Sequence, residues 1–176
     1  MTFNIRYGTA QDGDHAWPNR DALAATLPGY REIGVRREDG VAAGEYAAIL
    51  VDTMRFTLRQ HGTKWLSDTP DVVGSTSWGN RITRIVTFVL LADRANGEQL
   101  WVYNVHLDHE SQPSRERAVQ FVLELMRDQE HRRLARDAAA AEDVGMAPDP
   151  RMLLMGDFNA DETNPAFRLA VAGSLV

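Results

Sequence analysis

Hydrophobic and polar residues alternate along several short segments in the first half of the chain, a spacing typical of β-strands. Phe3 and Ile5 alternate with polar neighbours, which predicts a strand over residues 2–7. The apolar run YAAILV at residues 46–51 has the length of a strand, and the alternating run MRFTLRQ at residues 54–60 is expected to be its hairpin partner. This part of the chain is therefore expected to be rich in β-structure.

The strongest β-pattern lies near the middle of the chain. Residues 81–91 (RITRIVTFVLL) and residues 100–107 (LWVYNVHL) are rich in the β-branched and aromatic residues that favour strands. The dipeptide Asn-Gly at 96–97, between them, favours the tight turns of hairpins. A β-hairpin is therefore predicted over residues 81–107, after a long polar loop at residues 61–80.

After the hairpin, apolar residues recur about every 3.6 residues, which indicates an amphipathic helix. Ser111 and Pro113 are suitable residues for its start, and residues 113–136 are expected to form mostly one helix. The helix is expected to pack on the outside of a sheet through an apolar face that comprises Ala118, Phe121, Val122, Leu125 and Met126. A last apolar run, RMLLMG at residues 151–156, predicts a short buried strand.

Composition and charge narrow the class of protein. A chain of 176 residues with 44% hydrophobic residues is expected to form a single domain over residues 1–176 with a real core. Its formal net charge of −6 does not indicate a protein that tracks nucleic-acid phosphates with basic side chains. The absence of cysteine excludes disulfides, zinc–thiolate sites and cysteine nucleophiles. No segment has the pattern of a membrane span or a signal peptide, so a cytoplasmic location is expected.

The candidate chemistry lies where predicted strands end. The sequence GDFN at residues 156–159 follows an apolar run directly, so Asp157 and Asn159 are expected to point the same way from the end of a strand. A carboxylate in that place is able to activate water or ligate a metal ion, and an amide is able to donate to phosphate oxygens. Taken alone, the same four residues are also typical of a simple turn.

A second group of polar residues, NVHLDH at residues 104–109, ends the hairpin. A single histidine such as His106 is more often structural than catalytic, but Asn104, Asp108 and His109 lie close to it in sequence. His-x-Asp-His also resembles the end of the His-x-His-x-Asp-His motif of metallo-β-lactamase-type hydrolases, although Asn104 stands where the first histidine ligand belongs. Asn4, inside the first predicted strand, is a third candidate, because asparagine is disfavoured in strands.

In the order TFNIRYG, GEYAAILVD, KWLSDTPDVVGS, RIVTF, NVHLDH and LLMGDFNA, the chain resembles the bacterial endonuclease/exonuclease/phosphatase family along nearly its whole length. The resemblance implies an α/β (α+β) fold of the DNase I-like type. This fold is a four-layer sandwich, with two mixed β-sheets packed face to face and helices outside. The resemblance also implies a divalent metal ion, usually Mg²⁺ with Mn²⁺ as a possible substitute, and hydrolysis of a phosphate ester by in-line attack of water.

The resemblance assigns roles to particular side chains. It places Asn4 and Asp157 at the metal ion, and Asn4, His106 and Asn159 at the phosphate group. Asp157 would orient or deprotonate the attacking water, and Asn159 would help to hold that water. His106 would contact or protonate the phosphate. The resemblance also brings Arg84 towards the phosphate without giving it a role. Oxygen ligands such as these suit Mg²⁺ better than softer metals.

Two family features have no counterpart in the sequence. The family's second strand ends in a Gln-Glu pair whose glutamate is its main metal ligand, and a later Ser-Asp-His motif supports the attacking water. Glu32 and Glu45 match other parts of the family pattern, so neither is expected to replace that glutamate. We therefore expect an incomplete DNase I-like fold, with an internal deletion and a truncated C-terminal part.

The sequence leaves three functions open. The first is a metal-dependent phosphoesterase, with activity on a phosphodiester or phosphomonoester that is impaired by the missing segments. The second is a non-catalytic relative that binds a phosphorylated ligand, and the third is a metallo-β-lactamase-like hydrolase. The expected partner is a phosphate-ester substrate. Nucleic acid is possible but is not indicated by the charge, and an incomplete fold is expected to self-associate through exposed apolar surface.

Overall fold

The structure, a computed structural model, describes residues 27–140 and 150–173. The strand predicted at residues 2–7, and Asn4 within it, lie outside the described residues. The described elements are, in chain order, β1 (Tyr30–Ile33), β2 (Ile49–Asp52), β3 (Phe56–Trp65), β4 (Ile85–Asp93), β5 (Gln99–His106), α2 (Gln112–Ala140), β6 (Arg151–Asp157) and α3 (Pro165–Gly173).

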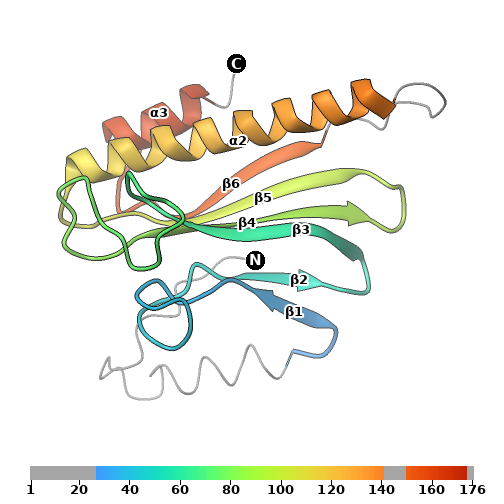
Figure 1. Cartoon of the computed structure of the whole chain (residues 1–176), viewed down its shortest axis with the longest axis horizontal. Helices are drawn as coiled ribbons and strands as arrows, with labels where there is room; N and C mark the ends of the chain where they lie inside the picture. The colour runs from blue at the N-terminus through green and yellow to red at the C-terminus, as the bar shows by residue number, and fades with distance from the viewer. Residues whose placement is uncertain (1–26, 141–149, 174–176) are drawn as a thin grey trace.

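These elements form three layers (Figure 1). Strands β3, β4, β5 and β6 form a mixed sheet in that order, in which β6 is parallel to β5 and the other neighbours are antiparallel. Helices α2 and α3 lie on one face of this sheet, and an antiparallel two-stranded sheet of β1 and β2 lies on the other. Two sheets face to face with helices outside agree with the predicted sandwich, in an incomplete form.

The predicted hairpin at residues 81–107 is confirmed, because β4 pairs with β5 around a turn at Asn96 and Gly97. Gly97 has a φ of 75°, a left-handed conformation that glycine adopts at little cost. The first strand of the hairpin begins at Ile85 rather than at residue 81, since the preceding residues belong to the loop.

The hairpin predicted between residues 46–51 and 54–60 is wrong. β2 pairs with β1, while β3 belongs to the other sheet and pairs with β4 over ten residues. The carboxylate of Asp52 accepts hydrogen bonds from the backbone N–H groups of Met54 and Arg55, and so forms a tight turn that carries the chain from one sheet to the other.

Two further predictions need correction. The polar loop predicted at residues 61–80 begins later, because β3 continues to Trp65. β3 is the edge strand of the described sheet and is half-exposed, so it carries polar residues that resemble those of a loop. The strand predicted at residues 151–156 exists as β6, but it is only partly buried. Among the described strands β6 lies at the edge of its sheet, so an apolar sequence here does not imply full burial.

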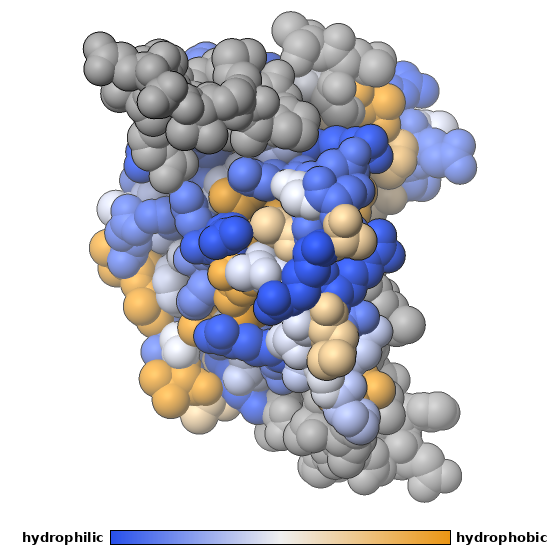
Figure 2. All heavy atoms as spheres, turned by 90° about the vertical axis from the view of Figure 1, so that its right-hand side faces the viewer, coloured by the Kyte–Doolittle hydropathy of each residue, from blue (hydrophilic) through white to orange (hydrophobic). Residues whose placement is uncertain are grey.

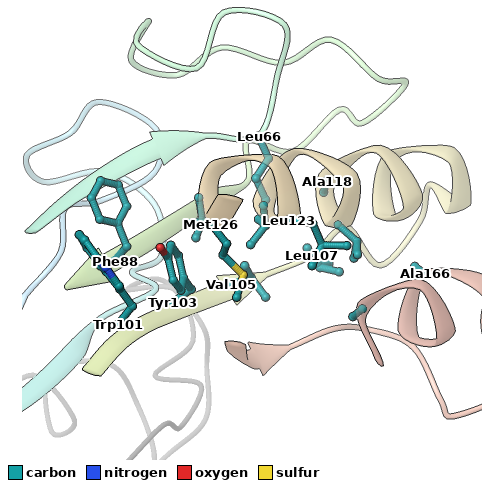
Figure 3. Packing of buried hydrophobic residues seen from close by; sticks show 14 of the residues in the cluster. Leu66, Phe88, Trp101, Tyr103, Val105, Leu107, Ala118, Leu123, Met126 and Ala166 are labelled. Atoms are coloured by element: carbon teal, nitrogen blue, oxygen red, sulfur yellow. The ribbon is translucent and has the colours of Figure 1, made fainter. Parts of the chain in front are cut away.

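Helix α2 packs on the sheet as predicted. Val122 is 1% exposed, and Phe121 and Leu125 are partly buried against the same core. Figure 3 shows this core, in which α2 side chains such as Leu123 and Met126 meet aromatic and aliphatic side chains of β4 and β5. Helix α3, which the sequence analysis did not predict, buries Ala166 and Ala170 against the same cluster.

A second apolar layer joins the two sheets. It consists of Ile33, Ile49 and Val51 from the small sheet and Val89, Leu91 and Val102 from the large one. The Nδ2 of Asn104 in β5 donates to the carbonyl oxygen of Ala48 at 2.8 Å, and so joins the end of the loop that carries Glu45 and Tyr46 to the large sheet. Within the residues that the structure describes, no helix is long and apolar enough to cross a membrane.

We expect the chain to self-associate through the edge of β6. In the described part of the chain, β6 hydrogen-bonds only to β5, and its Leu153 is 46% exposed. No charged residue or proline lies between Met152 and Gly156, so this edge lacks the features that block pairing with another strand. By contrast, hydrophilic residues cover most of the described surface at the end of the molecule with the β4–β5 turn (Figure 2).

Light scattering over a range of concentrations tests this expectation. The apparent mass should rise with concentration, and Leu153→Lys should reduce the rise because it places a charge on the edge strand. A monodisperse monomer at high concentration, with no binding of a dye that reports apolar surface, would contradict it.

Candidate phosphoesterase site

The parallel pairing of β5 and β6 brings two of the predicted site residues side by side. His106 and Asp157 are partners in the register, each at the carboxyl end of its strand. The backbone N–H of Leu107 also donates to the carbonyl oxygen of Asp157, 2.9 Å away, so the two strand ends are fixed to each other. Rigid strands therefore position both side chains.

The turn after β6 places Asn159 at the same edge. Asn159 has a positive φ of 46°, which asparagine tolerates better than most residues, and its backbone N–H donates to Asp157 Oδ1 at 2.9 Å. Its side-chain Nδ2 donates to the carbonyl oxygen of Leu107 at 2.8 Å. One of its two amide N–H groups is thus used to hold the turn against the end of β5.

His106 lies between two carboxylates. Its Nε2 is 3.8 Å from Asp157 Oδ2, and its Nδ1 is 3.4 Å from Glu45 Oε2. Glu45 is buried and forms a 2.5 Å ion pair with Arg37. The four side chains make a continuous row, which ends at the half-exposed carboxylate of Asp157.

The sequence analysis did not assign Glu45 to the site. The structure places its carboxylate beside His106, where it is able to orient the imidazole. The signal in the sequence was a glutamate directly before an apolar strand, at the end of a turn rich in glycine and alanine. That signal is weak, because most such glutamates are exposed.

Arg84 lies close to this row but does not reach the cleft. It is 2% exposed; its Nε is 3.3 Å from Asp108 Oδ2, and its Nη2 is 2.8 Å from His109 Nδ1. Asp108 also accepts hydrogen bonds from the backbone N–H groups of Glu110 and Ser111 just before α2. The structure therefore gives Arg84 and Asp108 a role in holding the loop between β5 and α2.

A cleft of about 440 Å³ opens at this edge of the sheet. Its lining comprises Tyr46, Ala47, Asn104, Val105, His106, Gly156, Asp157, Phe158, Asn159, Ala160 and Phe167. His106, Asp157 and Asn159 thus lie together, and no lysine or arginine is among the described residues that line the cleft.

Burial lowers the pKa of the His106 imidazole from 6.5, and the nearby guanidinium of Arg84 lowers it further. The carboxylates of Glu45 and Asp157 oppose this shift without reversing it. In the metal-free protein the imidazole is therefore expected to titrate below pH 6.5.

Because the unfolded chain binds this proton at a higher pH than the folded chain, His106 contributes stability that is fully present above about pH 6.5. That stability is lost as the pH falls through the folded pKa.

An NMR titration of the His106 ring proton measures this pKa. Glu45→Gln should lower the midpoint further, because it removes a negative charge that raises the pKa. A midpoint above pH 6.5, or a midpoint that rises in Glu45→Gln, would contradict the electrostatic description of the site.

Comparison with known proteins shows which solved structures this chain is similar to. No family model matches the sequence. The structure matches that of an endonuclease/exonuclease/phosphatase family protein from Bacteroides thetaiotaomicron with a TM-score of 0.74 and 29% identity, over 88% of this chain and 50% of that one. The similarity to this solved family member supports the resemblance to the endonuclease/exonuclease/phosphatase family. The recognition from sequence is thereby confirmed, and so is the predicted DNase I-like fold in its incomplete form.

Two further proteins are similar to this chain. A mannosyl-6-phosphatase of Bacteroides thetaiotaomicron matches with a TM-score of 0.71 and 29% identity, over 88% of this chain and 52% of that one. An uncharacterized protein of Acanthamoeba polyphaga mimivirus is 26% identical over 139 residues, which is 77% of this chain and 45% of that protein. The chain thus spans about half the length of these relatives.

The side chains of the cleft also bear on which metal ion the cleft is able to hold. Among the described residues, no three histidine, aspartate or glutamate side chains are placed to share a metal ion. His106 is the one histidine among the described residues of the lining, and the Nδ2 of Asn104 donates to the carbonyl oxygen of Ala48 at 2.8 Å. This does not suit the zinc site of a metallo-β-lactamase, which uses several histidines. The carboxylate of Asp157 is an oxygen donor of the kind that Mg²⁺ takes.

Proposed function

We propose that the chain is a metal-dependent phosphoesterase, which hydrolyses a phosphodiester or phosphomonoester by in-line attack of water. The observation that supports this best is the placement of His106 and Asp157 at the ends of two paired parallel strands, where both line a cleft of about 440 Å³. The Nε2 of His106 is 3.8 Å from the Oδ2 of Asp157. Phosphoryl transfer requires positioned groups and stabilisation of spread negative charge more than covalent chemistry. A phosphatase among the structural neighbours supports the same class of reaction.

The charge of the cleft supports a requirement for a cation. Two carboxylates, those of Asp157 and Glu45, flank His106, and no cationic side chain is found in the described lining. Glu45 is paired with Arg37, so a phosphate group in this cleft would meet the carboxylate of Asp157 and, in the described lining, no cationic side chain. A bound Mg²⁺ or Mn²⁺ would supply the missing positive charge next to the phosphate oxygens.

Each side chain has a distinct task in the proposed reaction. Asp157 would help to hold the cation and would orient the attacking water or accept its proton. His106, held by Glu45, would contact the phosphate, and in its protonated form, which acidic pH favours, it would donate a proton to the phosphate or to the leaving group. Asn159 would help to hold the phosphate, and Asn4, which is outside the described residues, would join Asp157 at the cation and Asn159 at the phosphate.

The rate is expected to be low compared with family members that have the Gln-Glu pair. Mg²⁺ sheds its water reluctantly and needs carboxylates to hold it. Of the two carboxylates beside His106, that of Glu45 is already paired with Arg37. We therefore expect weak binding of the cation, which high metal concentrations would offset.

Hydrolysis of bis-p-nitrophenyl phosphate by the purified chain tests the proposal, with titrations of Mg²⁺ and Mn²⁺ and with a chelator as the blank. Slow turnover that rises through the millimolar range of metal and stops with the chelator is the expected result. The same rate with and without the chelator would overturn the metal requirement. Fast turnover at sub-millimolar Mg²⁺ would show that other residues complete the cation site.

A further inference from the structure

Two aromatic side chains from different layers form walls of the cleft. Tyr46 belongs to the loop that leads into β2, and Phe167 belongs to α3 on the other side of the large sheet. The Phe167 ring packs edge-to-face on Phe158, with 5.9 Å between centroids and 72° between planes. The guanidinium of Arg36 lies over the Tyr46 ring, with its Cζ 4.9 Å from the ring centroid. Both walls are therefore supported by neighbouring side chains.

The size of the cleft limits what it is able to enclose. A volume of about 440 Å³ lies towards the lower end of the range of roughly 300–1,000 Å³ that is usual for small-molecule sites. It has room for a phosphate group and a ring-bearing alcohol. The small side chains of Ala47 and Ala160 leave space between the aromatic walls and the polar residues.

The charge of the cleft argues against a polynucleotide. Binding to a nucleic-acid backbone depends on several lysine and arginine contacts with phosphates outside the reacting one. The described lining holds no lysine or arginine, and the whole chain carries a formal net charge of −6. The aromatic walls suit an uncharged ring, since sugars and bases both pack on aromatic faces, and Arg36, which lies over Tyr46, is not among the described lining residues.

We propose that the cleft takes a small phosphate ester with an uncharged ring, such as a phosphorylated monosaccharide or nucleoside, and that this ring packs against Tyr46 and Phe167. This inference rests on the proposed phosphoesterase function, because it assigns the leaving group of the same reaction. On this inference Phe167 and Tyr46 determine substrate specificity, whereas His106 and Asp157 act on the phosphate.

The first test is a comparison of kcat/KM, with Mn²⁺ present, for glucose 6-phosphate, AMP, glycerol 3-phosphate and a 20-nucleotide DNA. The two ring-bearing esters should exceed glycerol 3-phosphate by about tenfold, the order expected for one stacked ring. Whichever of glucose 6-phosphate and AMP is preferred identifies the ring as a sugar or a nucleoside. DNA as the best substrate would overturn the inference.

The second test uses Phe167→Ala, with Phe167→Tyr as the conservative control. Phe167→Ala should raise KM for the preferred ring-bearing ester by about tenfold and leave KM for glycerol 3-phosphate unchanged, while Phe167→Tyr keeps both. An equal loss on both esters would show that Phe167 has only a structural role, and would overturn the inference.

Binding of AMP and glucose 6-phosphate to the chain with Mg²⁺, measured by calorimetry, separates this inference from the proposed function. Binding that Phe167→Ala weakens supports the ring subsite even if no ester is hydrolysed, a result that would overturn the phosphoesterase function alone. Failure of both ligands to bind would overturn the ring subsite.

Discussion

Replacement of His106 by alanine is expected to lower the rate of phosphate-ester hydrolysis by about 10²–10⁴-fold, the usual contribution of a positioned acid–base group. The His106 side chain is only 15% exposed, and it lies between Glu45 and Asp157 at the cleft. Loss of the ring removes the group that would contact the phosphate. Steady-state hydrolysis of bis-p-nitrophenyl phosphate at saturating metal measures the effect.

His131→Ala is the matched control, because His131 is exposed on α2 and is not part of the cleft lining. Its rate should equal that of the unchanged chain. Glu45→Gln should have an intermediate effect, since Glu45 acts by orienting His106 and does not line the cleft. If His106→Ala retains most of the activity, then His106 is a structural residue.

The second large effect is on stability. Gly156→Ala is expected to lower the free energy of unfolding by about 3–5 kcal/mol, because overpacking and an unfavourable φ act together. Gly156 has a φ of 135°, and a Cβ atom there would lie 2.0 Å from the backbone oxygen and 2.7 Å from the backbone nitrogen of Val105. Backbone atoms in a paired strand cannot move aside as a flexible side chain would. Denaturant unfolding followed by circular dichroism measures the change.

Gly97→Ala is the control for this prediction. Gly97 also has a positive φ, 75°, but no atom lies within 4 Å of the place where its Cβ would stand. The substitution should cost only the conformational strain of about 1–2 kcal/mol. Equal losses in the two variants would contradict the close packing of Gly156 against β5.

Elements with a strong local pattern were predictable from the sequence. The hairpin of β4 and β5 and the helix α2 follow from β-branched residues, an Asn-Gly turn and a helical apolar face, all of which are local properties. The pairing of β3 was not predictable in this way. Residues 54–60 follow β2 closely in sequence, but a turn at Asp52 sends them to the other sheet, and only tertiary packing decides between the two partners.

The candidate site shows the same division. His106, Asp157 and Asn159 follow apolar strands and belong to short motifs, so the sequence indicated them, although their catalytic roles remain predictions. Glu45 was not found, because its contact with His106 joins residues 61 positions apart and depends on how the two sheets pack. The aromatic walls at Tyr46 and Phe167 were missed for the same reason.

The central claim is that the cleft at the ends of β5 and β6 hydrolyses phosphate esters with the help of Asp157. The most direct measurement compares metal-dependent hydrolysis by Asp157→Asn with that by Asp161→Asn, each relative to the unchanged chain. Asp161 is an exposed aspartate four residues further on, whose carboxylate accepts hydrogen bonds from Thr163 and which does not line the cleft. Loss of activity in Asp157→Asn with full activity in Asp161→Asn is the predicted result, and full metal-dependent activity in Asp157→Asn would contradict the account.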